Sequence, residues 1–168
     1  SLIRGLVERR YMKIIYAPNE MPENADTDSM IFLAGSIEMG IAENWQDKVI
    51  HLLQDENVLI LNPRRLDWDS SWVQSIENSK FKEQVEWELD ALDMADKIIL
   101  YFDPKTKSPI SLLELGLFAD SGKMIVCCPD GFWRKGNVDI VCKRYKIRQI
   151  KNLNEIVEAL KHVDSSSQ

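Results

Sequence analysis

The sequence predicts an open α/β fold in which helices cover both faces of a parallel sheet. Two observations support this fold class. Short apolar runs alternate along the chain with stretches of helical spacing, and four of the runs are continuously apolar rather than alternating. Continuous runs are typical of strands buried on both faces of a parallel sheet. Alternation of strands with helices is typical of a doubly wound sheet.

Each element follows from its local pattern. Five strands are expected at residues 31–34, 58–61, 98–102, 124–128 and 147–150. Helices are expected at residues 42–55, 80–95, 111–121 and 153–163, and the last of them opens with a variant capping box, Asn152-x-x-Glu155. Residues 12–29 are a candidate extra edge strand (12–17) followed by a polar loop. We interpret residues 1–168 as one domain with a disordered tail at 164–168.

Composition narrows the class of protein. The chain has 168 residues, enough for one domain with a sizeable core, and a net charge of −6. That charge argues against a broad nucleic-acid-binding face, although local arginines can still bind a small anion. No apolar run approaches the roughly 20 residues that a membrane span requires. Because the N-terminus also lacks a hydrophobic signal core, we expect a cytoplasmic protein without nucleic-acid or membrane partners.

The cysteines and histidines do not suggest a metal site. Cys127, Cys128 and Cys142 form no C-x-x-C pair, and the adjacent two lie in an apolar run. They read as buried small hydrophobes. His51 and His162 are the only imidazoles. We therefore expect no metal and no cofactor.

One glutamate, Glu114, lies in apolar sequence surroundings. Ser108 and Pro109 suit a helix start, and Ser111-x-x-Glu114 also fits a capping box. The structural interpretation is that Glu114 caps the start of the helix. The functional one is a nucleophile, since a helix N-terminus favours an ionised carboxylate.

A second glutamate, Glu88, falls inside the apolar stripe of its predicted helix. Burying a carboxylate without a partner is costly, so either a functional site or a buried ion pair with Arg64 or Arg65 is implied. Two carboxyl groups on neighbouring helices, one ionised and one protonated, match the arrangement of retaining glycosidases. The stripe consists of Phe81, Val85, Leu89 and Leu92.

Polar residues follow the predicted strands at the edge where open parallel sheets bind ligands. Residues 62–72 add two arginines, two acids and two tryptophans. This segment is either a surface loop with a tryptophan packed on the core, or a binding loop. In the second case an arginine meets a phosphate or carboxylate and an aromatic ring stacks on a planar group.

Several short motifs occur in an order that resembles a known family. They are IFLAGS at 31–36, NPRR at 62–65, QVEWE at 84–88, Ala-Asp at 95–96 and LELG at 113–116. Together they resemble the nucleoside 2-deoxyribosyltransferase family, specifically its divergent deoxyribosyltransferase-like branch, over roughly residues 30–142. The resemblance implies a flavodoxin-like fold and cleavage of the N-glycosidic bond of 2′-deoxynucleosides. Related members hydrolyse nucleoside monophosphates.

The resemblance also implies roles for particular residues. Glu114 is expected to attack C1′, and Glu88 stands where relatives often carry an aspartate that contacts base or sugar. Relatives complete their pockets with residues of a neighbouring subunit, so a homo-oligomer is expected. The predicted substrate-binding residues, with Gly35 and Ser36 on the pocket floor, are Gly35, Ser36, Asn62, Arg64, Arg65, Trp68, Asp103 and Ser111.

Other interpretations remain open at this point. Whether water or a second base finishes the reaction decides between a hydrolase and a transferase. A nucleotide-binding or sensing module without turnover is the alternative from another class. A flavin-binding protein is disfavoured, because no phosphate loop rich in Ser or Thr follows Ala34. Residues 131–144 are expected to form a lid or interface, and Trp133 is an alternative to Trp68 for stacking on the base.

Overall fold

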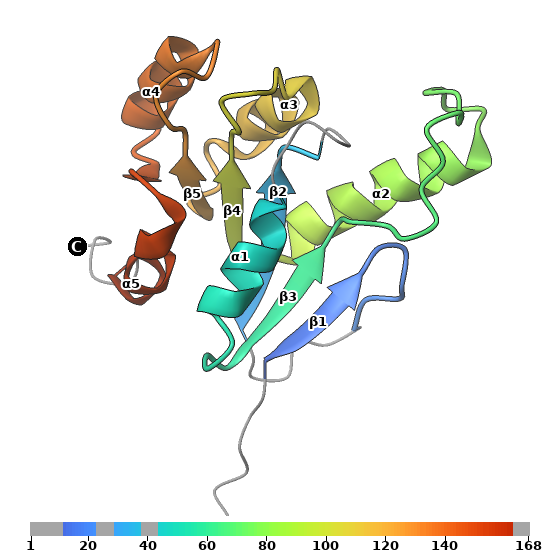
Figure 1. Cartoon of the computed structure of the whole chain (residues 1–168), viewed down its shortest axis with the longest axis horizontal. Helices are drawn as coiled ribbons and strands as arrows, with labels where there is room; N and C mark the ends of the chain where they lie inside the picture. The colour runs from blue at the N-terminus through green and yellow to red at the C-terminus, as the bar shows by residue number, and fades with distance from the viewer. Residues whose placement is uncertain (1–11, 23–28, 38–43, 163–168) are drawn as a thin grey trace, which may run out of the picture.

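A computed structural model describes residues 12–22, 29–37 and 44–162. In this part of the chain six strands form one parallel sheet of order β1-β3-β2-β4-β5-β6 (Figure 1). The strands are β1 Lys13–Tyr16, β2 Ser29–Gly35, β3 Val58–Asn62, β4 Lys97–Tyr101, β5 Met124–Cys127 and β6 Arg148–Ile150. The helices are α1 Trp45–Leu52, α2 Ser79–Met94, α3 Pro109–Phe118, α4 Lys135–Arg144 and α5 Ile156–His162, with a 3-10 turn at Leu153–Glu155. None of these helices is long and apolar enough to span a membrane.

The strand order is consistent with a flavodoxin-like fold. When β2 is counted as the first strand, the strands from β2 to β6 run in the order 2-1-3-4-5. The sheet has six strands rather than five, because β1 pairs in parallel with β3. The topological switch point, where the strand order reverses, lies between β2 and β4. Ligands of open α/β sheets bind beyond the carboxyl ends of the strands at this point, so this is the expected ligand site.

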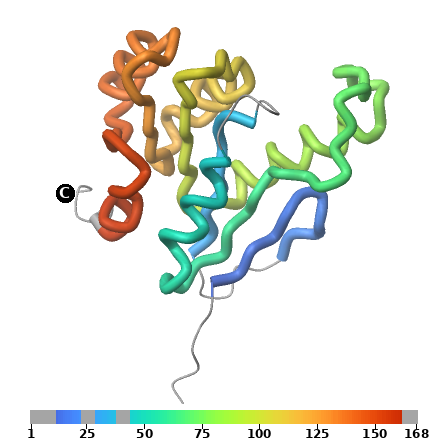
Figure 2. Tube along the Cα trace, in the orientation of Figure 1, coloured from blue at the N-terminus to red at the C-terminus, as the bar shows by residue number. Residues whose placement is uncertain are grey.

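Helices cover both faces of the sheet (Figures 1 and 2). On one face α2, α3 and α4 pack over the core, and on the other α1 and α5 do so. This double cover explains why every residue of β3 is buried and why the apolar runs are continuous. The three cysteines are free and buried, as predicted. Trp45 of α1 is buried as well.

Residues 131–144 differ from the prediction. Most of this segment is α4, which buries Val138 and Cys142. Phe132 is also buried and packs on Phe102 at 4.8 Å between ring centroids. The prediction of a lid or interface is therefore wrong for Phe132 and for the buried face of α4. The sequence pattern hid this helix because Gly136 disfavours helix and its apolar stripe is short.

The start of α3 corrects a second prediction. The helix begins at Pro109, and Ser108 stands at its N-cap with φ 46° and no side-chain capping bond. Ser111 and Glu114 lie inside the helix, so the predicted capping box is wrong. Glu114 falls in the second turn, beyond the reach of most of the helix dipole. The predicted box at Asn152 and Glu155, in contrast, is formed.

Candidate functional site

Glu114 is a buried carboxyl group in the second turn of α3. Its side chain is only 8% exposed, and within the described part of the chain Oε2 has no hydrogen-bond partner. Burial raises its pKa to about 8, and the negative charge of Glu88 adds to the shift. The expectation that the helix end keeps Glu114 ionised is therefore wrong, because desolvation outweighs a dipole one turn away.

Glu88 is half-buried on α2 and lies close enough to Glu114 for their charges to interact. Burial raises its pKa to about 7, against the opposing effect of a 3.4 Å hydrogen bond donated by Gln84 Nε2. Because both groups titrate near neutral pH, the pair holds one proton between them over this range. Both carboxyl groups therefore have pKa values raised by burial.

The surroundings of Glu88 also differ from the sequence interpretation. Among the described residues Glu88 makes no ion pair with Arg64 or Arg65, so the structural alternative for this glutamate does not hold. The apolar stripe predicted for this helix was partly wrong, because Leu89 is 39% exposed. The buried face of α2 consists of Gln84, Trp87, Ala91 and Leu92.

The two arginines after β3 have different environments. Arg65 donates through Nε to Asp67 at 2.6 Å and pairs through Nη2 with Glu83 at 2.7 Å. Its side chain is 2% exposed and stacks at 5.2 Å on Trp72. Hydrogen bonding to Asp67 raises the pKa of Arg65. Arg65 therefore holds the loop together, with its charge already compensated.

Arg64 is half-buried and donates through Nε to Gln46 Oε1 at 2.9 Å. Its backbone N–H donates to Asn62 Oδ1 at 3.0 Å. Burial lowers its pKa, and the charge of Asp47 opposes that shift. No acidic side chain of the described residues forms an ion pair with it, so Arg64 keeps a cationic charge for a ligand.

The contacts of the predicted aromatic stackers are with groups other than the carboxyl pair. Trp68 packs edge-on against Trp72 at 4.9 Å between ring centroids. Trp133 is 50% exposed and donates its indole N–H to the Lys107 carbonyl at 2.8 Å. No described contact joins either ring to Glu88 or Glu114.

Gly35 and Ser36 tie the end of β2 to the loop after β4. Gly35 has φ +135°, and a Cβ there would collide with the Tyr101 backbone and with Trp45. The Ser36 hydroxyl accepts from Asp103 N at 3.0 Å and hydrogen-bonds Thr106 at 3.1 Å. Asp103 and Thr106 are both buried. A place for Gly35 and Ser36 on the floor of a substrate pocket stays a prediction.

The two remaining predicted substrate-binding residues, Asp103 and Ser111, are also buried. Asp103 is 3% exposed and accepts from Lys105 N at 2.9 Å through Oδ1. Ser111 is 3% exposed and stands one turn before Glu114 on α3. A direct contact of either residue with substrate stays a prediction.

Several buried polar atoms at this edge have no hydrogen-bond partner among the residues that the structure describes. Buried polar groups are almost always paired, so these atoms mark a place for water or a ligand. Gln46 and Gln84 were missed by the sequence interpretation, and their only signal was a glutamine on an otherwise apolar helix face. The atoms are Gln46 Nε2, Asn62 Nδ2, Arg65 Nη1, Gln84 Oε1 and Glu114 Oε2.

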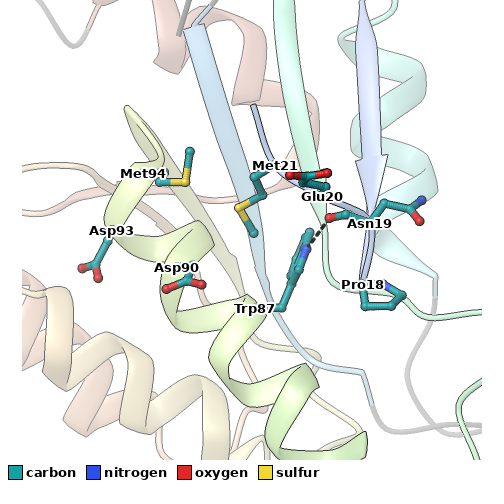
Figure 3. A pocket seen from close by; sticks show the side chains of 8 residues that line it. All are labelled: Pro18, Asn19, Glu20, Met21, Trp87, Asp90, Asp93 and Met94. Carbon is teal, nitrogen blue, oxygen red and sulfur yellow. Dashed lines mark hydrogen bonds between the residues drawn. The ribbon is translucent and has the colours of Figure 1, made fainter. Parts of the chain in front are cut away.

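Two hollows on the described surface lie elsewhere along α2. One of about 320 Å³ is formed between α2 and the segment after β1. Figure 3 shows the Trp87 ring reaching toward that segment, where its N–H donates to the Asn19 carbonyl at 2.9 Å. Neither this hollow nor a second one beside it is lined by Glu88 or Glu114. The candidate site therefore rests on its polar chemistry, and residues 38–43, which follow β2, lie outside the described residues.

A metal centre finds no support in the described ranges. No group of three or more His, Cys, Asp or Glu side chains there could hold a metal ion. Burial raises the pKa of the Cys127 thiol to about 11, which disfavours the thiolate form that metals bind.

Comparison with known proteins adds one finding. The family model described as nucleoside 2-deoxyribosyltransferase like matches residues 28–132. This range contains the strands from β2 to β5, the helices from α1 to α3, and both carboxyl groups of the candidate site. A comparison with curated proteins finds no match.

Proposed function

Because the chain belongs to the nucleoside 2-deoxyribosyltransferase-like family, we propose that it cleaves the N-glycosidic bond of a nucleoside or nucleotide. The observation that carries this proposal is the interacting pair of carboxyl groups, Glu88 and Glu114. Two neighbouring carboxyl groups that share one proton supply an acid and a nucleophile in one site. Glu114 Oε2 and Gln84 Oε1, which have no partner within the described ranges, suit the hydroxyl groups of a sugar.

In the proposed reaction a carboxylate oxygen of Glu114 attacks C1′ of the sugar. The C1′–N bond breaks, and its electron pair goes to the base, which takes the proton of Glu88. The shared proton must therefore reside on Glu88 in the reacting state. Positive charge that develops at C1′ favours an ionised Glu114, which moves the proton in this direction. Water or a second base then attacks C1′, the bond between C1′ and the Glu114 oxygen breaks, and the proton of the attacking group passes to the carboxylate of Glu88.

The test is release of free base, followed by chromatography. The protein is incubated with 2′-deoxynucleosides and their monophosphates, with and without an acceptor base. We expect free base from the native protein and a loss on the order of a thousandfold in Glu114→Gln. Glu86→Gln is the matched control, because Glu86 is an exposed glutamate of the same helix as Glu88.

The outcomes separate the open interpretations. A new nucleoside formed with the acceptor base indicates a transferase, and free sugar without it indicates a hydrolase. Undiminished release by Glu114→Gln removes Glu114 as the nucleophile. Tight nucleotide binding without any release indicates a binding module.

We further propose that the protein forms a homo-oligomer through α3. Ile110, Leu113 and Leu117 are each more than half exposed and lie on one face of this helix. Glu114 borders that face, so a neighbouring subunit would enclose it, in line with the resemblance to enzymes that share pockets between subunits. Light scattering should show a dimer or larger species that Leu113→Lys dissociates; a monomeric native protein would contradict this.

A further inference from the structure

Positive charge is concentrated in one short part of this acidic chain. Residues 131–151 contain seven Lys and Arg side chains and one acid, Asp139, although the whole chain has 21 Lys and Arg against 27 Asp and Glu. Asp139 is itself engaged, because it pairs with Lys135 at 3.2 Å and accepts from Gln149 Nε2 at 2.9 Å. The segment therefore places a locally basic surface on a protein whose net charge is −6.

Helix α4 contributes one exposed face to this surface. Val138 and Cys142 are its buried residues. The helical period places Ile140, Lys143 and Arg144 on the opposite side. Ile140 is 70% exposed, and both cations are exposed too. Because residues three and four positions apart are neighbours on a helix, the two cations flank the isoleucine.

The chain that leaves α4 continues the same surface. Tyr145 is 48% exposed, and Lys146 and Arg148 are exposed as well. Among the described residues no ion pair involves these two cations or the two exposed cations of α4. Together the side chains form what we call the basic surface, which consists of Ile140, Lys143, Arg144, Tyr145, Lys146 and Arg148.

The basic surface lies away from the candidate site. Arg148 is the first residue of β6, which is the last strand in the order of the sheet. Because the strands are parallel, the amino end of β6 and the carboxyl ends that hold the candidate site lie at opposite edges of the sheet. Helix α4 is the outer member of its layer, beyond α3 as seen from α2 (Figure 1). A partner on the basic surface therefore contacts the molecule away from Glu88 and Glu114.

Structural roles account for only part of this set. Lys143 and Arg144, in the last turn of α4, complement the helix dipole. Arg148, on an edge strand, disfavours pairing with a strand of another chain. Neither effect explains Lys146, and neither explains why two large side chains with apolar surface are exposed among the cations.

A membrane surface with anionic lipids matches both kinds of side chain. Lipid headgroups attract the cations, and the boundary between headgroups and acyl chains accepts exposed aliphatic and aromatic side chains. A single-stranded nucleic acid offers the charge, but only Tyr145 could stack on its bases and Ile140 has no counterpart. Acids elsewhere on the protein oppose binding little, because exposed charges more than about 8 Å apart are largely screened at physiological salt.

We propose that the basic surface docks on an anionic lipid membrane, with Ile140 and Tyr145 at the headgroup boundary and the cations on the headgroups. This docking is peripheral and reversible, because it uses surface side chains of a folded helix and strand. It goes beyond the proposed function and does not depend on it. The expectation of no membrane partner rested on net charge and on long apolar runs, and neither measure detects a local surface.

Sedimentation of the full-length protein with lipid vesicles tests the proposal. Vesicles of phosphatidylcholine alone are compared with vesicles in which about one lipid in three is phosphatidylglycerol. We expect the protein to sediment with the anionic vesicles only, and to be released at about 0.5 M NaCl. Lys146→Glu combined with Arg148→Glu should weaken this binding by about tenfold or more. Lys48→Glu combined with Lys80→Glu makes the same change in net charge at exposed positions of α1 and α2, and should bind nearly as the native protein does.

A substitution without a change of charge tests the apolar part of the surface. Ile140→Ser should weaken binding to the anionic vesicles by about threefold or more, because it removes the aliphatic side chain that enters the headgroup boundary. Ile76→Ser is the matched control, since Ile76 is 76% exposed and lies outside the basic surface. Its binding should equal that of the native protein.

Other outcomes overturn the proposal. Absence of binding to anionic vesicles, or binding that Lys146→Glu with Arg148→Glu weakens no more than the control pair does, removes the basic surface as a membrane contact. Binding that Ile140→Ser leaves unchanged removes the contact with the headgroup boundary. Tighter binding to an oligonucleotide than to the vesicles assigns the surface to nucleic acid. If the glutamate pair does not fold by circular dichroism, Lys146→Gln with Arg148→Gln replaces it, with a smaller loss expected in the same direction.

Discussion

Replacing Glu114 by glutamine should stabilise the protein at alkaline pH and leave its stability almost unchanged at acidic pH. The carboxyl group has a pKa of about 8 in the folded protein, against an ordinary value of 4.5. Between these two pH values the folded state binds more protons than the unfolded state. The free energy of unfolding of the native protein therefore falls as pH rises through this window.

The size of the effect follows from the width of the window. Each pH unit in which only the unfolded state is ionised costs about 1.4 kcal/mol. A window from 4.5 to about 8 gives an upper limit of about 5 kcal/mol, and part of the shift belongs to repulsion by Glu88. We expect Glu114→Gln to be more stable than the native protein by on the order of 3 kcal/mol at pH 9.

Urea denaturation followed by tryptophan fluorescence at pH 5, 7 and 9 measures this difference. The gap between Glu114→Gln and native protein should widen with pH, while Glu86→Gln should follow the native protein at each pH. A constant gap, or a gap that narrows with rising pH, would refute the assignment of a raised pKa to Glu114.

Four further substitutions test other parts of the structure. Glu88→Gln removes a like charge, so the pKa of Glu114 should fall and the rising limb of the pH–rate profile for base release should move to lower pH, with a lower maximum; an unmoved limb contradicts the pairing. Gly35→Ala should destabilise by about 2 kcal/mol or more, whereas Gly116→Ala, in an open helical position, should stabilise by about 0.5–1 kcal/mol, both by urea melts. Arg65→Met leaves Asp67 and Glu83 unpaired and should speed proteolysis between α2 and β3; unchanged cleavage would show that the loop holds without it.

Much of the fold was predictable because burial on both faces leaves a direct mark on sequence. The runs at β2, β3, β4 and β5 are continuously apolar, and each became a buried strand. The same logic singled out Glu88 and Glu114 as carboxyl groups out of place. Helix α4 escaped because Gly136 and a short apolar stripe leave little periodic signal.

The site chemistry was less predictable, because it depends on which groups the fold brings together. Ser108 and Ser111 both suit a helix start, and only the backbone shows that Glu114 lies a turn inside α3. The upward shift of both carboxyl pKa values follows from burial in the folded protein, which the sequence does not show directly. The sequence does not single out Gln46, because its role depends on the contact of its buried amide with Arg64 in the folded protein.

The central claim is that Glu114 forms a covalent bond to the sugar during cleavage of an N-glycosidic bond. Mass spectrometry of peptides from protein quenched during incubation with deoxynucleosides and their monophosphates tests it directly. We predict a sugar adduct on the peptide that contains Glu114, absent from Glu114→Gln and formed together with free base. Base release without any adduct, and with Glu114→Gln still active, would contradict the claim.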